Sequence, residues 1–424
     1  MTLFDILAIL VSLSAVFAWL NHRFLKLPTT IGVMLIALLM SLGLIALGPL
    51  SGGVEQNLTH LMDTVEFDDT LLHGLLSFLL FAGALHVNLD DLARQRWVIA
   101  ALATAGVIGA TFLIGLMADG VFHLVGLDVP LIYCFLFGAL ISPTDPIAVM
   151  GILKSVGAPK SLATKITGES LFNDGVAVVV FLVLLDMATG TREVSAAEIF
   201  RLFTQEALGG VLFGLLLGGL GYAMLKSVNN YQVEVLITLA LSSGGYAAAE
   251  AAHLSAPIAI VVAGLLIGNH GRLLAMSGRT REHLDTFWEL VDEVLNAVLF
   301  VLIGLEVLVL AFRAEYLIAS ALLIPAALLA RLISVGVPIG LMRRFREFSP
   351  NTVQILTWGG LRGGISVALA LSLPQGQPRD TLVAATYGVV VFSILVQGLT
   401  LGRLVRRSLR AHPDADTPSD PATP

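Results

Sequence analysis

Long apolar runs recur along the whole chain, and they restrict its fold more than any other feature. Repeated runs of about 18 residues or more, without the alternation of outer-membrane barrel strands, are typical of helices that cross a membrane. The composition agrees, because 56% of the 424 residues are hydrophobic and only 13% are charged. We therefore expect an all-α polytopic membrane protein. Its thirteen predicted spans are residues 4–20, 30–48, 70–87, 97–118, 129–152, 166–187, 206–226, 233–251, 254–269, 285–308, 315–341, 352–373 and 381–402.

The positions of the basic residues test this number of spans, since cytoplasmic loops collect Lys and Arg. With the N-terminus outside, eighteen of the 24 basic residues fall on one side, four on the other and two within spans. The eighteen are Arg23, Lys26, Arg94, Arg96, Lys154, Lys160, Lys165, Lys226, Arg272, Arg279, Arg281, Arg343, Arg344, Arg346, Arg403, Arg406, Arg407 and Arg410. The four are Arg192, Arg201, Arg313 and Arg379, and the two within spans are Arg331 and Arg362. A missed span would invert the pattern after it, so we predict an external N-terminus and a cytoplasmic C-terminus.

The two ends of the chain carry separate predictions. The first apolar run has a signal peptide as its alternative, but it lacks a basic start, carries Asp5 and is followed by Arg23 and Lys26. The last residues, "AHPDADTPSDPATP", are polar and Pro-rich, too poor in apolar groups to pack. We predict one membrane domain over residues 1–408 and a disordered cytoplasmic tail over residues 409–424. The net charge of −7 gives no reason to expect nucleic acid as a partner.

Two prolines lie inside the fifth predicted span, in "LFGALISPTDPIAVMGIL". Pro143 and Pro146 lack an N–H, and each disfavours helical geometry in the residue before it. A broken helix at membrane depth is tolerated only where its backbone is buried in protein or lines a water-filled cavity. Asp145 also fits a helix cap ahead of a proline. A simple kink with a capping aspartate and a broken helix at a binding site therefore both stay open.

The sixth predicted span starts with "GESLFNDGVAVVVF", where polar residues precede an apolar run. At roughly 100° per residue these side chains share one face of a helix; they are Glu169, Ser170, Asn173 and Asp174. Charged residues inside a membrane are expensive and are usually functional. A pair between Lys165 and Glu169 at i, i+4 would explain Glu169, but not the deeper Asp174. We therefore predict a functional site on this face.

Two arginines also lie within predicted spans. A guanidinium stays charged, so a buried one needs carboxylate or carbonyl oxygens. Glu169 is the natural partner for Arg331. Arg362 sits in "GGLRGG", a weak point in a helix, where its charge can meet the negative ends of half-helices. Interruptions in the fifth and twelfth spans indicate an inverted-repeat transporter whose site lies at mid-membrane.

Four stretches in order, "SPTDPIAV", "GESLFNDGVAVVVF", "FVLIGLEV" and "LRGGISVALALSLP", resemble the monovalent cation:proton antiporter-1 family. This family includes NhaP-type bacterial sodium/proton antiporters and animal sodium/proton exchangers. The resemblance covers residues from about 70 to 400. It implies a homodimer in the bacterial cytoplasmic membrane, with thirteen helices per protomer. Each protomer would have a dimerisation part and a six-helix ion-transporting core with two crossed, partly unwound helices.

The resemblance also implies roles for the polar residues. Asp174 would carry the cation or the proton, and Asn173 would order the site. Ser170 and the backbone of Thr144 would be cation ligands, and Asp145 would be the acid of the unwound crossing. The bound metal would be a monovalent cation held by Asp174, Ser170 and Thr144.

The same resemblance assigns Glu169 and Arg331 to a buried ion pair that stabilises the core. The sequence departs from the family in the third span, where many relatives carry a further acid. "HGLLSFLLFAGALHVNL" has none, and its polar residues His73, His86 and Asn88 lie near its ends. The carboxylate charge at the site would then be lower, which leaves ion identity and affinity open.

A mechanism follows from the chemistry of a desolvated carboxylate, which favours its neutral form. Asp174 becomes neutral by binding a proton or by pairing with a cation, but not both. With alternating access, this predicts exchange of a monovalent cation, Na⁺ first and Li⁺ or K⁺ as alternatives, for protons. Asn173 in place of a second acid predicts electroneutral 1:1 exchange. The alternatives are a cation channel and a proton-coupled transporter of another solute on the same fold.

Other partners and activities are narrower expectations. The chain should contact lipid and a second copy of itself. No enzyme or cofactor is expected, since none of the nine histidines has the His-Glu-x-x-His spacing of a zinc peptidase.

For each of two further stretches, the sequence allows two interpretations of the role of its residues. "GGVLFGLLLGGLGY" has glycines at GxxxG spacing, which serves either packing within the fold or a dimer contact. "FWELVDEVLNAVLF", at the start of the tenth span, either draws cations and senses pH or is a solvated helix end. Its polar residues are Glu289, Asp292, Glu293 and Asn296.

Overall fold

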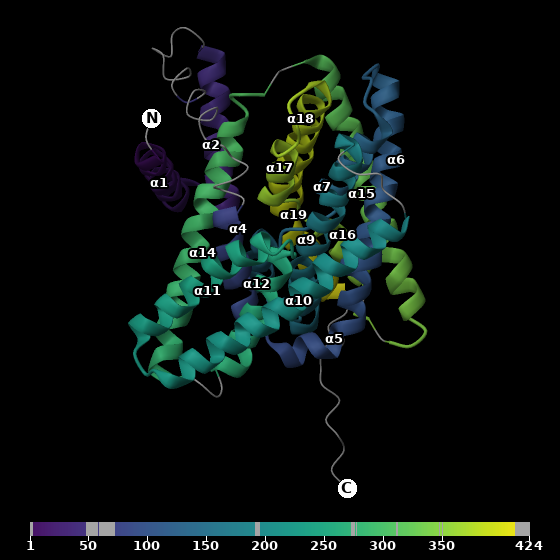
Figure 1. Cartoon of the computed structure of the whole chain (residues 1–424). Helices are drawn as coiled ribbons and strands as arrows, with labels where there is room; N and C mark the ends of the chain where they lie inside the picture. The colour runs from purple at the N-terminus through teal and green to yellow at the C-terminus, as the bar shows by residue number, and fades with distance from the viewer. Residues whose placement is uncertain are drawn as a thin grey trace.

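The computed structural model of the chain is a bundle of helices (Figure 1), and no strand occurs among the residues that it describes. The expectation of an all-α protein is therefore confirmed. The structure describes residues 3–47, 58, 73–190, 196–272, 276, 278–310, 313–346, 348–349 and 351–411.

The helices follow the predicted spans along the chain. Those of the first half are α1 (Leu3–Leu20), α2 (Thr29–Leu47), α4 (His73–Leu85), α5 (Leu89–Ala101), α6 (Val107–Val125), α7 (Leu131–Ile141), α8 (Ile147–Ser155) and α9 (Lys160–Thr189). Those of the second half are α10 (Ala196–Ser227), α11 (Tyr231–Ala251), α12 (Ala256–Leu266), α14 (Gly278–Glu306), α15 (Ala314–Met342), α16 (Thr352–Trp358), α17 (Gly364–Leu371), α18 (Gln377–Phe392) and α19 (Gly398–Ala411). Short π-helical turns extend or join them at η1 (Asn21–Leu25), η4 (Leu102–Gly106), η5 (Ile267–Gly271) and η6 (Ser393–Gln397).

Within the described residues, seven helical segments are long and apolar enough to cross a membrane. They are Phe4–Leu25, Thr29–Leu47, Leu89–Val125, Lys160–Thr189, Thr204–Ser227, Ala314–Met342 and Gln377–Arg410. Shorter apolar helices occupy Gly74–Leu85, Leu131–Ile141 and Ala256–Gly271. The helix α14 is long enough but carries several acidic residues in its first half.

The fifth and twelfth predicted spans are each divided into two helices. Between α7 and α8 the chain leaves helical geometry at the two prolines, and between α16 and α17 it does so at the glycine-rich stretch. The two interruptions touch, because the backbone N–H of Asp145 donates to the carbonyl oxygen of Leu361 at 2.8 Å. Segments more than 200 residues apart in sequence therefore meet at one place.

Buried apolar side chains of the described residues form two large clusters. One includes residues of α1, α2, α6, α7, α15, α17 and α18, and the other includes residues of α4, α10, α11 and α12. The helix α9 contributes to both, with Phe181 in the first cluster and Leu171 in the second. The helix α14 does the same, with Phe300 in the first and Trp288 in the second. These two helices therefore lie at the boundary between the clusters.

The glycines at GxxxG spacing pack α10 against α12. A Cβ atom on Gly214 would lie 2.5 Å from the carbonyl oxygen of Ala259, and one on Gly210 would lie 2.8 Å from that of Ser255. Since real Cβ atoms do not approach oxygen so closely, the spacing serves close helix packing within the fold. This geometry favours the first of the two interpretations drawn from the sequence.

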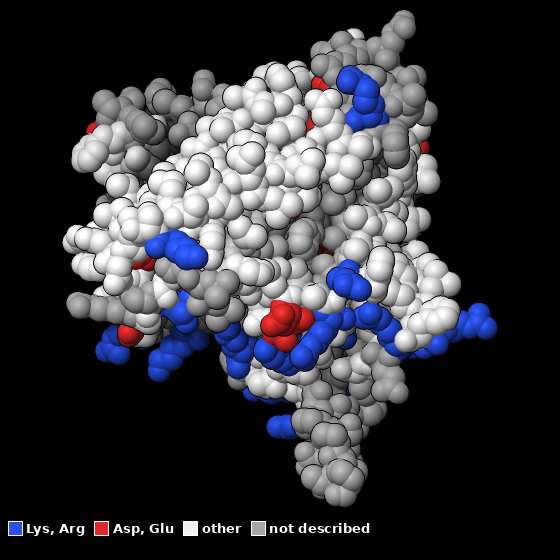
Figure 2. Space-filling view, turned by 60° about the horizontal axis from the view of Figure 1, so that its bottom comes forward, with Lys and Arg blue, Asp and Glu red and all other residues white. Residues whose placement is uncertain are grey.

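Lys and Arg side chains gather at one end of the molecule (Figure 2), while the surface above it is mostly free of charge. This division matches the charge asymmetry in the sequence. The helix α19 continues to Ala411, three residues beyond the predicted end of the membrane domain. The remainder of the predicted tail, residues 412–424, lies outside the described residues.

Candidate functional site

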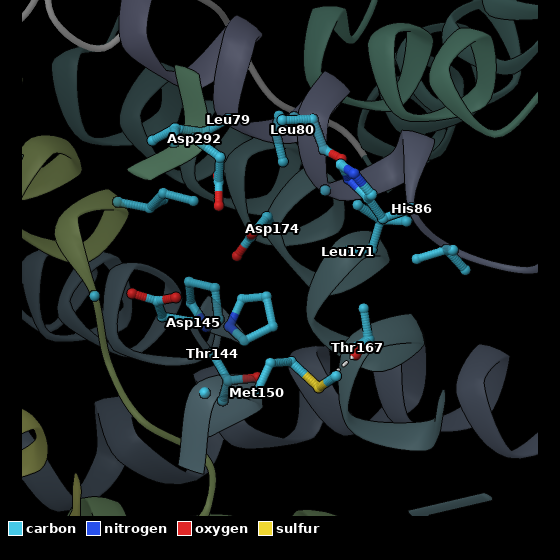
Figure 3. A pocket seen from close by; sticks show the side chains of 18 of the residues that line it. Leu79, Leu80, His86, Thr144, Asp145, Met150, Thr167, Leu171, Asp174 and Asp292 are labelled. Carbon is cyan, nitrogen blue, oxygen red and sulfur yellow. Dashed lines mark hydrogen bonds between the residues drawn. The ribbon is translucent and has the colours of Figure 1, made fainter. Parts of the chain in front are cut away.

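A cavity of about 510 Å³ lies beside the break between α7 and α8 (Figure 3). Helices α4, α5, α8, α9, α14 and α17 and the connection between α4 and α5 supply the rest of its lining. Its α4 wall is apolar, formed by Leu75, Leu76, Leu79 and Leu80. Lys154 and Lys160 line its other end, and the Lys160 side chain is 78% exposed. The cavity therefore opens toward solvent at a mouth that carries basic residues.

The carboxylate of Asp174 faces this cavity. The residue lies on α9 and is only 5% exposed. Figure 3 shows its side chain directed into the space between α9, α14 and the α7–α8 break. Within the described part of the chain, no hydrogen-bond donor contacts this carboxylate. Asp145 lines the same cavity and is close enough for its charge to act on Asp174.

Asn173 ties the non-helical segment to α9. Its amide nitrogen Nδ2 donates to Thr144 Oγ1 at 2.9 Å, and its Oδ1 accepts from the backbone N–H of Thr144 at 3.4 Å. Thr144 Oγ1 lies 3.0 Å from Ser170 Oγ. All three residues are at most 3% exposed. These side-chain bonds satisfy polar groups of the break and fasten it to the turn of α9 that carries Ser170 and Asn173.

Arg362 lies at the break between α16 and α17, and its side chain binds the break between α7 and α8. Its Nη1 donates to the carbonyl oxygens of Ser142 at 2.7 Å and Pro143 at 2.8 Å. These carbonyls follow the last turn of α7, where the helix dipole is negative. The guanidinium, only 3% exposed as a residue, therefore meets the partial negative charge that the broken helix leaves.

Glu169 and Arg331 form a buried ion pair between α9 and α15. Arg331 Nη1 lies 2.5 Å from Glu169 Oε1, and the two side chains are 6% and 1% exposed. Lys165, the alternative partner in sequence, instead places its Nζ 5.2 Å from the ring centroid of Phe348. A Cβ atom on Gly360 would lie 2.7 Å from Arg331 Nε, so this glycine makes room for the guanidinium.

Asp292 also lines the cavity. In the sequence it belongs to "FWELVDEVLNAVLF", for which drawing cations was one of two interpretations, and it was not among the predicted site residues. It lies on α14, where Asn296 Nδ2 donates to its Oδ1 at 3.1 Å and to its carbonyl oxygen at 2.7 Å. Figure 3 shows its carboxylate directed toward Asp174. The sequence did not indicate which acidic residue of this stretch faces the site. The third span contributes no carboxylate to the described lining, only apolar residues and His86.

Comparison with known proteins identifies the family of the chain. The family described as "Sodium/hydrogen exchanger, transmembrane" matches residues 11–407. The chain belongs to the sodium/hydrogen exchanger family. The resemblance found in the four sequence stretches is thereby confirmed. Because this is a family of transporters and the described helices include long apolar ones, the chain is an integral membrane protein.

Individual members of the sodium/hydrogen exchanger family match over nearly their full length. The chain is 52% identical to the Na⁺/H⁺ antiporter NhaP of Pseudomonas aeruginosa over 414 residues, which is 96% of this chain and 98% of that protein. It is 37% identical to the Na⁺/H⁺ antiporter NhaH of Halobacillus dabanensis over 407 residues, 95% of this chain and 96% of that protein. Its fold matches the sodium proton antiporter MjNhaP1 of Methanocaldococcus jannaschii, solved at pH 8. That match has a TM-score of 0.76 and 19% identity over 96% of this chain and 100% of that one.

Proposed function

We propose that the chain is a secondary active antiporter that exchanges a monovalent cation for protons across a membrane. Na⁺ is the first candidate, because the relatives at 52% and 37% identity are named Na⁺/H⁺ antiporters, with Li⁺ and K⁺ as alternatives. One observation carries the proposal. A carboxylate that is 5% exposed and has no donor within the described residues faces a cavity that reaches solvent.

Asp174 is the exchanging group in this proposal. Burial makes its charged form unfavourable, so it takes up either a proton or a cation. Hydroxyl oxygens suit a hard cation. Those of Thr144 and Ser170 lie 3.0 Å apart, Ser170 is one turn before Asp174 on α9, and Asn173 donates to Thr144 Oγ1 and keeps it in place. Asp145 adds negative charge to the cavity. Because proton and cation compete for one carboxylate, release of one permits binding of the other.

Transport further requires that the site face each side in turn. The described cavity opens beside Lys154 and Lys160, which belong to the predicted cytoplasmic side. We assign this as the inward-facing form. Relative movement of the two apolar clusters, which meet along α9 and α14, would close this mouth and open another. Antiporters with interrupted helices commonly work by such rocking.

The remaining predictions on architecture belong to the same proposal. It includes thirteen membrane spans with two crossed half-helix pairs, an external N-terminus, and a homodimer in the bacterial cytoplasmic membrane. The transporter domain, residues 1–408, holds the dimerisation part and the ion-transporting core. In that core, the Glu169–Arg331 pair and Arg362 serve stability, because their charges are already matched by a carboxylate or by carbonyls.

The test is exchange in everted membrane vesicles that contain the chain. Respiration acidifies the vesicle lumen and quenches a pH dye; addition of Na⁺, Li⁺ or K⁺ should then restore fluorescence in a saturable way. Vesicles without the chain are the control. If none of the three cations restores fluorescence, antiport is refuted. A channel would instead carry a cation current without obligatory proton movement.

A further inference from the structure

We propose that Asp292 is a second cation-binding carboxylate, which holds the incoming cation in the cavity before it reaches Asp174. This inference rests on the proposed antiport function. It adds a residue of α14 to the path that the cation follows, and it favours one of the two interpretations that the sequence left open for this acidic stretch.

The position of Asp292 supports this role. Its carboxylate lines the same cavity as those of Asp145 and Asp174, and Figure 3 shows it directed toward Asp174. Because the two carboxylates face one cavity, a cation that enters it would meet Asp292 and Asp174 in succession.

Asn296 keeps Asp292 in this orientation. It binds both the side chain and the backbone carbonyl of Asp292, and it is only 2% exposed. Its own Oδ1 is buried and has no hydrogen-bond partner within the described residues. A buried amide oxygen without a donor is unfavourable. A cation beside Asp292 would supply the missing positive partner.

The charges around the cavity favour a cation as the occupant. Asp145, Asp174 and Asp292 contribute negative charge, and the basic residues that line the cavity, Lys154 and Lys160, belong to its mouth. Lys160 is already paired with Asp91, with 2.6 Å between Nζ and Oδ2. A monovalent cation would neutralise the carboxylates of Asp174 and Asp292, which also line this cavity.

The next residue provides a matched control. Glu293 lies on the same helix but faces a different cavity, together with His22 and Lys26. A substitution there removes the same charge from the same helix without changing the lining around Asp174. If a substitution of Asp292 changes transport and a substitution of Glu293 does not, the change is due to the loss of the carboxylate from the cavity.

The experiment compares Asp292→Asn, Asp292→Glu and Glu293→Gln in the vesicle assay over a range of Na⁺ concentrations. Asp292→Asn should raise the apparent KM for Na⁺ about tenfold and leave the maximal rate within about twofold, because it removes binding but not the exchanging carboxylate. Asp292→Glu, which restores the charge, and Glu293→Gln should keep KM near that of the wild type.

A second readout does not depend on transport. Na⁺ that binds the folded protein raises its unfolding temperature, and at a fixed Na⁺ concentration the rise is larger when the Kd for Na⁺ is lower. The rise at a fixed Na⁺ concentration should be smaller in purified Asp292→Asn than in the wild type and Glu293→Gln. If Asp292→Asn fails to reach the membrane, Asn296→Ala replaces it. That variant leaves the charge but releases the side chain, and should raise KM by a smaller factor.

Three results would overturn the inference. They are an unchanged KM in Asp292→Asn, an equal rise in Glu293→Gln, or a loss of maximal rate with unchanged KM. Failure of the antiport proposal looks different, because the wild type would then show no cation-dependent fluorescence change at all.

Discussion

The buried pair of Glu169 and Arg331 is a single contact on which the stability of the protein should depend. Removing one partner leaves a buried charge without compensation, which costs about 3–5 kcal/mol. Glu169→Gln and Arg331→Gln should each lower the unfolding temperature in detergent, and the double variant should lose less than the sum of the two. An unfolding temperature for Glu169→Gln equal to that of the wild type would contradict the structural role.

The polar residues of α9 could be recognised from sequence because they are neighbours in it. Asn173, Asp174 and Ser170 share one helix face, which follows from helical geometry alone. The break that brings Thr144 to them was also predictable, because Pro143 and Pro146 interrupt the helix there. Asp292 could not be recognised in this way. Which face of α14 lines the cavity depends on packing between helices far apart in the chain, and helix periodicity does not encode it.

The break between α7 and α8 and the break between α16 and α17 approach each other closely because residue 363 is a glycine. A Cβ atom on Gly363 would lie 2.3 Å from Asp145 Oδ2. Gly363→Ala should therefore displace Asp145 and reduce the exchange rate by about tenfold to a hundredfold, since small displacements at a site are costly. Gly340→Ala on α15, where a Cβ would meet nothing within 4 Å, is the control. Equal rates in the two variants would show that the interruptions tolerate separation.

The packing of α10 on α12 gives a second prediction for the helices. Gly214→Leu should lower the unfolding temperature, because its side chain would enter the space of Ala259. Gly219→Leu on the same helix should not, since a Cβ there meets nothing within 4 Å. Size-exclusion chromatography and thermal unfolding of the two variants check this. A change of oligomeric state in Gly214→Leu without loss of stability would point to the dimer contact instead.

Helix ends were less predictable than helix positions. The fourth predicted span starts at residue 97, whereas the helix starts at Leu89, where Asn88 Oδ1 accepts from the backbone N–H of Asp90 and Asp91. Hydropathy detects the part of a helix that suits lipid and misses charged turns beyond it. The contact between the breaks was equally hidden, because it joins segments from opposite halves of the sequence.

At the scale of the whole molecule, the proposed exchange of one monovalent cation for one proton predicts transport without net current. In the proposed mechanism only Asp174 exchanges a proton for a cation, and Asn173 carries no charge. In proteoliposomes, the rate of Na⁺/H⁺ exchange should stay the same when a K⁺ gradient with valinomycin sets the membrane potential to different values. A rate that follows the potential would refute 1:1 exchange. The measurement requires that K⁺ itself is first shown not to be transported.

The arrangement of helices as a whole was predictable to the extent that lipid imposes it. Apolar runs and basic loops locate the helices, because the bilayer acts on every span in the same way. They do not show which spans adjoin, and therefore did not show that α9 and α14 both lie at the boundary between the two apolar clusters. The cavity forms at that boundary, so its full lining needed the structure.

The central claim is that Asp174 holds a proton or a cation but never both, and purified protein tests it most directly. Na⁺ is added to the protein in weakly buffered detergent solution, and released protons are followed with a pH dye. We predict that the wild type releases one proton for each Na⁺ bound at a pH where the empty site is protonated, and that Asp174→Asn releases none. Equal proton release by wild type and Asp174→Asn, or Na⁺ binding by the wild type without proton release, would contradict the account.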